Sequence, residues 1–372
     1  MKQERIYLSP PHQSGDEIKA FQKVLDTNWL APVGPDLERF EEEICQVTGF
    51  KYAVATASGT AALHLGLMTL GVAKGDRVLS SNLTFAGAVN PIIYQGGVPV
   101  FVDAESDSWN MDTRLVEEYL SESNGVKAMV PTHLYGMPAD VFKLEKLGQK
   151  YQIPLLHDLA ECLAGKVNGE KIGKHISRGI LSFNGNKLIT TSGGGAFVTN
   201  NKEEAEQALY LATQAKSNGI GYHHEAIGYN YRMSNVLAAL GVAQIKTLSD
   251  RVEKKQQIFE TYQSELSSLG CEFQQETNGV TSDRWLTCVL FDQDSNLEIA
   301  SIVQQMDSFN IEVRPLWKPM HLQPIFQNEK VIRGEISDNL FQRGLCLPSG
   351  CGLTHNQQAY AIEKLKGVIN QS

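Results

Sequence analysis

The amino-acid sequence predicts an α/β protein of two domains, the larger one built on a mostly parallel sheet. At 372 residues the chain is longer than one hydrophobic core usually organises. Helical and strand-like patterns alternate from about residue 17 to residue 198, and the pattern changes beyond residue 270. We therefore expect a large domain over residues 1–245 and a small C-terminal α+β domain over residues 246–372.

The large domain opens with helical spacing of apolar residues at Ile18, Phe21 and Val24, which returns around Phe40. Residues 58–60 open a further helix of good helix formers over residues 61–70, and Ser58 predicts its cap. Short apolar runs between the helical segments are typical of buried strands. Seven such runs lie at residues 52–56, 77–80, 98–103, 128–131, 153–157, 179–183 and 195–198.

Long helical structure over residues 235–268 predicts the boundary between the domains. Beyond it, residues 284–291 and 311–317 are strand-like, while residues 297–309 and 355–368 have helical spacing. This mixture predicts the small α+β domain.

Composition excludes several classes of protein. The formal net charge of −9 argues against binding to nucleic acid, because that affinity comes largely from lysines and arginines on phosphates. The six cysteines are scattered without a CxxC pair, which favours reduced thiols of the cytoplasm over a zinc site or disulfides. The charged N-terminus predicts no signal peptide, and prolines and polar residues break the apolar stretch at 85–102, so we expect no membrane span.

Lys187 and Asp158 are the residues that first suggest a chemistry. Lys187 lies in a run that ends in three glycines, and Asp158 follows an earlier strand-like run. A lysine amine can condense with the aldehyde of pyridoxal phosphate (PLP), and a carboxylate can keep the cofactor's pyridine nitrogen protonated. Each residue alone has an ordinary alternative, a solvated loop lysine or a turn aspartate. Together they predict a PLP site.

A phosphate site is predicted at Ser58-Gly59-Thr60, where a helix begins after a strand. The free amides and the positive dipole end of a helix N-terminus bind phosphate, although the same pattern also occurs in ordinary strand-to-helix turns. Residues 169–175 come close to a nucleotide-binding P-loop. They have one residue too few between the glycines and end in His175 where Ser or Thr would bind magnesium.

A metal site is the other chemical alternative. His157, Asp158 and Glu161 could share a metal ion, and His223 and His224 could join them. No HExxH motif is present, however, and adjacent histidines point in different directions on regular structure. We therefore expect no metal.

Seven short motifs, in family order, make the chain resemble the sugar aminotransferases of the DegT/DnrJ/EryC1 family. The resemblance implies the fold-type I PLP-transferase architecture, aspartate aminotransferase-like, with a seven-stranded sheet in the large domain. The motifs are Leu30-Ala31-Pro32-Val33-Gly34, Ser58-Gly59-Thr60-Ala61-Ala62-Leu63, Thr84-Phe85, His133-Leu134-Tyr135-Gly136, Asp158-Leu159-Ala160-Glu161, Ser182-Phe183 with Lys187, and Gly228-Tyr229-Asn230-Tyr231-Arg232-Met233-Ser234.

Four further runs look like the branch of that family that aminates UDP-linked 4-keto-6-deoxy-N-acetylhexosamines, the UDP-N-acetylbacillosamine transaminases. They lie at residues 8–12, 184–195, 314–318 and 347–350. The chain departs from the family at one place. The usual acidic-Asp-Ala-Ala run is His157-Asp158-Leu159-Ala160 here.

The resemblance implies roles around the cofactor ring. Lys187 would be the catalytic lysine that binds the cofactor covalently, and Asp158 would pair with the pyridine nitrogen. Phe85 would stack on the ring, and Glu161 would lie near the cofactor hydroxyl. Phe85 could instead be a simple core residue.

The resemblance also implies how the cofactor phosphate is held. Gly59, Thr60 and Ser182 would hold it from the same chain. Asn230 would reach it from a second subunit, which makes a homodimer with shared active sites necessary. Ser182 could instead be a strand-end hydroxyl, and Asn230 a turn former.

Substrate residues are expected mainly in the C-terminal part. Arg314, Lys318 and His321 offer positive or donor groups for a pyrophosphate. Trp29 and Trp317 could pack on a sugar or a uracil ring. The alternatives are a solvated basic edge and ordinary core tryptophans.

The implied activity is transfer of the amino group of L-glutamate to C4 of the UDP-linked keto sugar, with Lys187 as general acid and base. One alternative is an aminotransferase for a dTDP- or GDP-linked keto sugar. Another is dehydration at sugar C3, where histidine replaces the lysine, so Lys187 argues against it. A third is a non-catalytic protein of the PLP fold.

Overall fold

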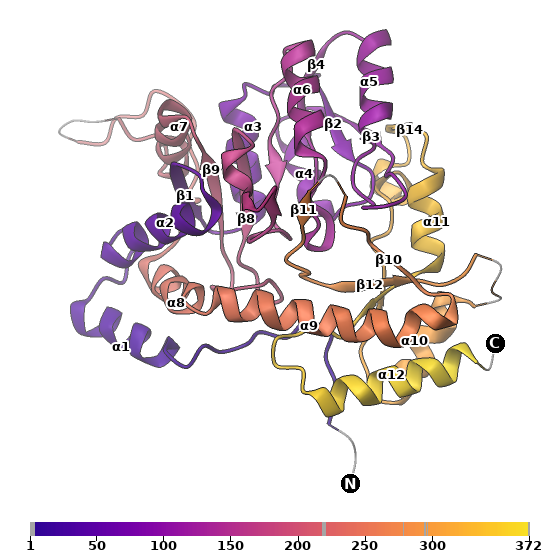
Figure 1. Cartoon of the computed structure of the whole chain (residues 1–372). Helices are drawn as coiled ribbons and strands as arrows, with labels where there is room; N and C mark the ends of the chain where they lie inside the picture. The colour runs from indigo at the N-terminus through magenta and orange to yellow at the C-terminus, as the bar shows by residue number, and fades with distance from the viewer. Residues whose placement is uncertain (1–3, 218–220, 278, 294, 296, 371–372) are drawn as a thin grey trace.

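The structure is a computed structural model that describes residues 4–217, 221–277, 279–293, 295 and 297–370. A wall of strands crosses the upper part of the protein in Figure 1, with helices packed around it. It comprises two four-stranded sheets of order β1-β9-β8-β5 and β14-β3-β2-β4. The strands are β1 (Tyr52–Thr56), β2 (Arg77–Ser81), β3 (Val98–Val102), β4 (Val126–Val130), β5 (His157–Asp158), β8 (Arg178–Ser182), β9 (Gly195–Thr199) and β14 (Lys330–Ile332).

The two sheets continue into each other between the segments of β4 and β5. Parallel bridges join Met129 to Leu155 and Thr132 to Asp158. Within the two sheets, β9 pairs antiparallel with β1 and β8, and the other pairs are parallel. The seven strand-like runs all contribute to this wall, and the predicted mostly parallel sheet is confirmed.

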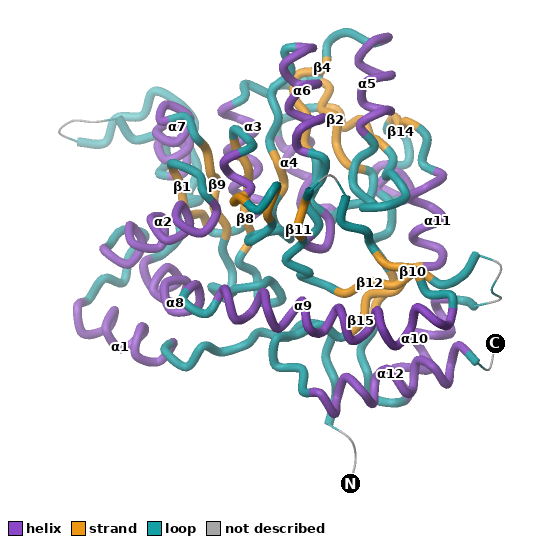
Figure 2. The backbone as a smooth tube through the Cα atoms, in the orientation of Figure 1, coloured by secondary structure: helices purple, strands orange, loops and turns teal. Residues whose placement is uncertain are grey.

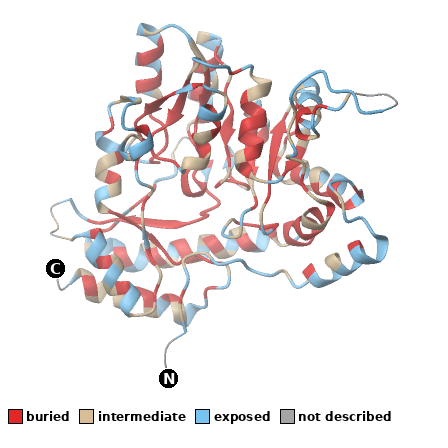
Figure 3. Cartoon of the chain, turned by 180° about the vertical axis from the view of Figure 1, so that it is seen from behind, coloured by how far each residue is buried: buried red, intermediate tan, exposed pale blue. Residues whose placement is uncertain are grey.

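Helices bury both faces of the wall, as the red strands in Figure 3 show. Side chains alternate between the faces of a strand, so Val198 of β9 enters the core that contains Phe40, while its neighbour Phe197 enters the core that contains Leu63. The helices of this half are α1 (Glu17–Thr27), α2 (Pro35–Thr48), α3 (Gly59–Thr69), α4 (Asn90–Tyr94), α5 (Thr113–Glu122), α6 (Val141–Tyr151), α7 (Lys202–Ala212) and α8 (Asn235–Ile245).

A third four-stranded sheet, antiparallel and with the order β10-β12-β15-β13, lies below the wall in Figure 2. Helices α9, α10 and α12 share a hydrophobic core with it, which includes Phe259, Val289 and Leu365. The elements are β10 (Glu272–Phe273), β12 (Thr287–Leu290), β13 (Arg314–Pro315), β15 (Gly344–Leu347), α9 (Leu248–Leu266), α10 (Ile299–Ser308), α11 (Glu335–Arg343) and α12 (His355–Ile369).

Two C-terminal segments pair with strands of the N-terminal half. Strand β14 lies parallel to β3 at the edge of the wall. Strand β11 (Val280–Thr281) pairs with β6 (Lys166–Val167), which also pairs with β7 (Glu170–Lys171). The chain therefore crosses between the halves more than once, and the division at residue 245 stays a prediction.

The long helical segment expected at 235–268 is interrupted. Helix α8 ends at Ile245 and α9 begins at Leu248, with Thr247 in a conformation outside the regular helix (φ −100°, ψ 12°). Thr247 Oγ1 donates to the Gln244 carbonyl at 3.0 Å, a local bond that competes with helix continuation. Within the described residues, we find no helix long and apolar enough to cross a membrane.

Candidate active site

A cavity of about 310 Å³ lies where β5, β8 and the first turn of α3 meet. Strands β5 and β8 are parallel, so their carboxyl ends bring Asp158 and Ser182 to the same edge. The predicted cofactor residues that line this cavity are Gly59, Thr60, Phe85, Asp158, Glu161, Ser182 and Lys187. Trp317, which was predicted to contact substrate, lines it too.

Lys187 follows β8 in a tight turn, in which its backbone N–H donates to the Asn184 carbonyl at 3.0 Å. Its amine lies 3.7 Å from Glu161 Oε1, and only 13 % of the side chain is exposed. Burial lowers the pKa of this amine, while the negative charges of Glu161 and Asp158 act in the opposite direction. A lysine in such surroundings gives up its proton more readily than one in water.

Asp158 ends β5 with its carboxylate beside the cavity. Burial raises the pKa of Asp158 to about 6, an effect that the Ala160 N–H, 2.9 Å from Oδ1, and the charge of Lys187 oppose. A buried carboxylate of this kind would be stabilised in its ionised form by a cation placed against it. The protonated pyridine nitrogen of the predicted cofactor would be such a cation.

The first turn of α3 has the features of a phosphate cradle. Ser58 caps the helix by accepting a hydrogen bond from the Ala61 amide at 3.1 Å. The helix start packs closely on β8, because a Cβ atom on Gly59 would lie 3.0 Å from Ser182 Cβ. Free first-turn amides and the hydroxyl groups of Thr60 and Ser182 form a donor set suited to a phosphate. These residues, with Lys187 and Asp158, fit pyridoxal phosphate.

Phe85 and Trp317 lie together at the mouth of the cavity. Their ring centroids are 5.3 Å apart, and Phe85 is 56 % exposed. This exposure excludes the alternative that Phe85 is a simple core residue. A stacking role for Phe85 stays a prediction.

Glu161 connects several parts of the site. Its Oε2 accepts a hydrogen bond from the Tyr135 amide at 2.8 Å, and its Oε1 accepts one from Trp317 Nε1 at 3.2 Å. Tyr135 is fully buried with φ 56°, and its hydroxyl oxygen accepts a hydrogen bond from the Trp317 amide at 2.7 Å. Glu161 is therefore fixed beside Lys187, whereas the predicted contact with a cofactor hydroxyl is untested.

The predicted substrate residues do not all meet. Arg314 and Lys318 line a larger groove of about 800 Å³, which shares Asn186, Trp285 and Trp317 with the lysine cavity. Arg314 Nη2 also lies 2.7 Å from Glu312 Oε1, so the guanidinium already has one anionic partner.

Three predicted residues lie outside both cavities. His321 Nδ1 is 3.0 Å from Asn82 Oδ1, and its Nε2 is 3.4 Å from Asp338 Oδ1, so the ring contacts neighbouring protein groups. Asn230 is exposed, and Trp29 is 42 % exposed after α1. In a single chain, Asn230 and Trp29 therefore do not join the cofactor residues.

Sequence reasoning missed Trp285, Asn184 and Asn186, which also line the lysine cavity. Trp285 lies just before β12, and nothing in the pattern around it distinguishes a site residue from a core tryptophan. The two asparagines are in the run with Lys187, so proximity in sequence was the signal that could have found them.

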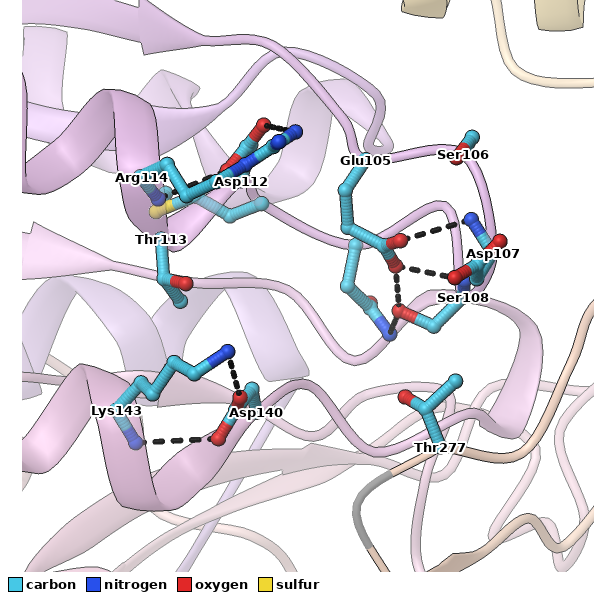
Figure 4. Close-up of a pocket in the computed structure, with 12 residues that line it drawn as sticks. Glu105, Ser106, Asp107, Ser108, Asp112, Thr113, Arg114, Asp140, Lys143 and Thr277 are labelled. Carbon is cyan, nitrogen blue, oxygen red and sulfur yellow. Dashed lines mark hydrogen bonds and ion pairs between the residues drawn. The ribbon is translucent and has the colours of Figure 1, made fainter.

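A separate polar hollow of about 410 Å³ lies away from these residues (Figure 4). Three of its carboxylates are bonded within their own turns. Glu105 accepts from the Asp107 and Ser108 amides, Asp112 pairs with Arg114, and the Asp140 side chain pairs with Lys143. These groups cap turns and helices, so the lysine cavity is the better candidate site.

The metal alternative can be compared with the contacts of His157. Its Nδ1 lies 2.9 Å from His133 Nε2, and its Nε2 lies 3.2 Å from Glu145 Oε1. His157 thus bonds away from its strand neighbour Asp158. Among the described residues, no group of three or more His, Cys, Asp or Glu side chains is arranged to hold a metal ion.

Comparison with known proteins gives a consistent result. The model of the DegT/DnrJ/EryC1/StrS aminotransferase family matches residues 11–366. The chain is 43 % identical over 370 residues to the putative pyridoxal phosphate-dependent aminotransferase EpsN of Bacillus subtilis (strain 168), with 97 % of this chain and 95 % of EpsN covered. It is 32 % identical over 367 residues to GDP-perosamine synthase of Vibrio cholerae, with 98 % and 99 % covered.

Among solved structures, the chain is similar to the putative sugar aminotransferase Spr1654 from Streptococcus pneumoniae in its PMP form. The TM-score is 0.92 at 23 % identity, with 98 % of this chain and 99 % of that chain covered. At this identity the likeness shows the fold. Together these findings confirm the predicted fold-type I architecture and pyridoxal phosphate as the cofactor.

Proposed function

We propose a reaction for this chain from the premise that it belongs to the DegT/DnrJ/EryC1/StrS aminotransferase family. The protein would transfer the amino group of L-glutamate to C4 of a UDP-linked 4-keto-6-deoxy-N-acetylhexosamine. The product would be a bacillosamine-type or related amino sugar for bacterial glycans, made in the cytoplasm. The observation that carries the amine-transfer reaction is the buried Lys187 amine, placed with Glu161 and Asp158 in one cavity at the start of α3.

Different residues of the cavity would hold different parts of the cofactor. Gly59, Thr60 and Ser182 would hold its phosphate, Asp158 its pyridine nitrogen and Lys187 its aldehyde carbon. When bound, pyridoxal phosphate supplies an electron sink that stabilises negative charge on the carbon losing or gaining a proton.

Lys187 would move that proton. Its amine must accept a proton from one carbon and return it to another, which requires both charge states to be accessible within the site. Burial favours the neutral amine, and the carboxylate of Glu161, 3.7 Å away, favours the ammonium ion. Because glutamate and sugar would use the same lysine in turn, kinetics should be ping-pong.

A homodimer would complete the site. Asn230 is exposed, while its backbone is held between Tyr229 and Tyr231, whose N–H groups donate to the carbonyls of Leu211 at 2.7 Å and Ala212 at 3.0 Å. A side chain on such a fixed backbone is well placed to contact a second copy of the chain. We propose that it reaches the cofactor phosphate of that copy.

The groove beside the lysine cavity supports the choice of a nucleotide sugar. Arg314 and the exposed Lys318 bring positive charge to it, and Trp317 borders both spaces. A sugar reaching Lys187 could therefore leave its diphosphate near these two cations. The UDP branch is favoured by the sequence runs at residues 8–12 and 184–195.

A GDP-linked 4-keto sugar is the second candidate. Two curated GDP-perosamine synthases, from Vibrio cholerae and Escherichia coli O157:H7, each share 32 % identity with this chain over nearly its whole length. A C3 dehydratase is disfavoured, because such enzymes have histidine where this chain has Lys187. A non-catalytic protein is disfavoured by the intact grouping of Lys187 and Asp158.

The test is a panel of UDP-, GDP- and dTDP-linked 4-keto-6-deoxy sugars incubated with glutamate and the cofactor-loaded protein. Formation of 2-oxoglutarate and the configuration of the new amine at C4 are measured for each sugar. The UDP-N-acetyl sugar should have the highest kcat/KM. A preference for the GDP sugar would overturn the UDP assignment, and no turnover of any sugar would overturn the proposed function.

A further inference from the structure

Trp285 contacts the reactive lysine in two ways. Its ring centroid lies 3.8 Å from Lys187 Nζ. Its Nε1–H donates at 2.7 Å to the carbonyl of Asn186, the residue before the lysine. The indole is 1 % exposed and so has a fixed position. It therefore touches both the amine and the peptide that carries it.

The backbone around Lys187 is also held by segments distant in sequence. Ser9 Oγ donates to the same Asn186 carbonyl at 3.1 Å. Arg251 Nη1 donates to the carbonyl of Leu188 at 3.3 Å. Because the peptides on both sides of the lysine are anchored, the remaining freedom is in its side chain, and the Trp285 ring limits where the amine can lie.

The charged groups that face the amine explain what the ring adds. Glu161, Asp158 and Asp283 attract the ammonium form, and burial opposes it. The face of an indole attracts a cation through its quadrupole without carrying charge, and the attraction strengthens when water is excluded. Trp285 thus favours the ammonium without adding a further buried carboxylate that would itself need a partner.

We propose that Trp285 is a positioning residue for Lys187, whose ring face holds the free amine as an ammonium ion inside the cavity. The functional meaning rests on the proposed function, since a proton-carrying lysine must exist in both charge states. The contact itself is independent of the sugar. Trp285 also borders the neighbouring groove, so a substrate entering from there would meet the same indole.

The experiment measures the protonation of Lys187 directly in the cofactor-free protein. Acetic anhydride labels neutral amines, and peptide mass spectrometry gives the labelling rate of Lys187 as a function of pH. The pH midpoint of that rate reports protonation, whereas a change in access alters the rate at all pH values alike. Trp285→Phe and Trp285→Met form a matched pair, because both lose Nε1–H and volume but only phenylalanine keeps an aromatic face.

The Trp285→Met protein should have a lower midpoint than wild type, with Lys187 labelled about three- to tenfold faster at a pH below the midpoint. The midpoint of the Trp285→Phe protein should lie closer to the wild-type midpoint. Ser9→Ala, which removes the other hydrogen bond to Asn186, should leave the midpoint unchanged. Equal midpoints for the Met and Phe variants would overturn the proposal.

Fluorinated tryptophans give a second test that preserves the shape of the side chain, in case the Met variant fails to fold. Each added fluorine weakens the negative face of the ring, so the midpoint should fall stepwise with fluorine number. All four tryptophans of the chain are replaced in this way. The same series in the Trp285→Phe background should be flat, and a flat series in the wild-type background would overturn the proposal.

These results are separable from the proposed function. A midpoint that follows the ring at position 285, in a protein that aminates no sugar, would uphold the contact and reject the reaction. If the protein aminates a sugar but the midpoint is the same whatever residue is at position 285, the reaction is upheld and the role of Trp285 is rejected.

Discussion

Lys187 Nζ and Glu161 Oε1 lie 3.7 Å apart in the cavity, and the Glu161 side chain is only 4 % exposed. Glu161 is fixed from the other side by Tyr135 and Trp317, so it cannot turn away from the lysine without losing two hydrogen bonds. The pair is thus held by its surroundings. In a low-dielectric site, its attraction counts for more than the same separation would on the surface.

Glu161→Gln should therefore reduce turnover. The negative charge of Glu161 raises the pKa of Lys187, so its loss should lower that pKa and make the ammonium harder to form. We expect kcat to fall about tenfold, equivalent to about 1.4 kcal/mol, with the titration of the free lysine moved to lower pH. A pH–rate profile measures both, and Glu117→Gln, at an exposed ion pair with Lys150, is the matched control.

Asp158→Asn should remove the charge that holds the protonated pyridine nitrogen. A preorganised electrostatic partner can be worth on the order of 3 kcal/mol in the transition state, so activity should fall about a hundredfold or more. The asparagine oxygen can still accept from the Ala160 amide, so cofactor should still bind, as absorbance after reconstitution will show. An unimpaired variant would mean that another carboxylate has this role.

Borohydride reduction of the cofactor-loaded protein should leave the mass of the cofactor on the peptide that contains Lys187. The physical reason is that Lys187 lines the cavity and burial favours its neutral amine, the form that condenses with an aldehyde. Peptide mass spectrometry identifies the site. Lys255, also buried but bonded to the Trp285 carbonyl at 2.7 Å, should stay unmodified, and its modification in place of Lys187 would refute the assignment.

A complementation experiment examines the shared site. Mixing a Lys187→Ala chain with an Asn230→Ala chain gives heterodimers in which one site has both its lysine and the asparagine of the other chain. Activity should return after subunit exchange of the two nearly inactive proteins. Lys187→Ala mixed with Asp158→Asn should not recover, because both residues line the cavity of one chain. If the Lys187→Ala and Asn230→Ala mixture also fails to recover activity after subunit exchange, Asn230 does not serve a partner's site.

Local sequence signals, besides the family resemblance, marked several residues that line the lysine cavity. A capping serine before two small residues marks the start of α3, and Asp158 and Ser182 end parallel strands, which must meet at one edge of the sheet. Trp285 lies 98 positions after Lys187 in the sequence. No periodic pattern predicts that its ring will contact the Lys187 amine. Residue type was also insufficient for His321, which faces Asn82 and Asp338.

The pairing of β14 with β3 escaped prediction for a related reason. Lys330–Ile332 is a three-residue strand more than two hundred positions from its partner, too short for a period-two pattern to identify. The five-residue strands of the large domain were predicted, because their buried side chains are mostly apolar whichever neighbour they pair with.

Asp283 should make stability depend on pH. Burial raises the pKa of Asp283 to about 7 in the folded protein, from about 4 when unfolded. A raised folded pKa means that the folded state keeps the proton longer, so stability should fall as pH rises from about 4 to 7 and level off above. The Asp283→Asn protein should lack this part of the slope, a difference on the order of 4 kcal/mol for a shift of about three pKa units. Urea unfolding of the cofactor-free proteins across this range measures it, and parallel curves would contradict the prediction.

Arg314 and His321 give the last prediction, because both were expected to bind the substrate diphosphate and the structure places only Arg314 beside the groove. The diphosphate does not take part in the reaction, so its cations should bind ground and transition states alike. Arg314→Gln should therefore raise KM for the nucleotide sugar about tenfold while changing kcat little, and KM for glutamate should not change. His321→Gln should leave the sugar KM near wild type, since the ring bonds to Asn82 and Asp338 outside both cavities. Steady-state kinetics with each substrate varied in turn measure kcat, the KM for the sugar and the KM for glutamate in each variant. An equal rise of the sugar KM in both variants would mean that His321 does contact the substrate. No rise in either variant would mean that the diphosphate does not bind in this groove.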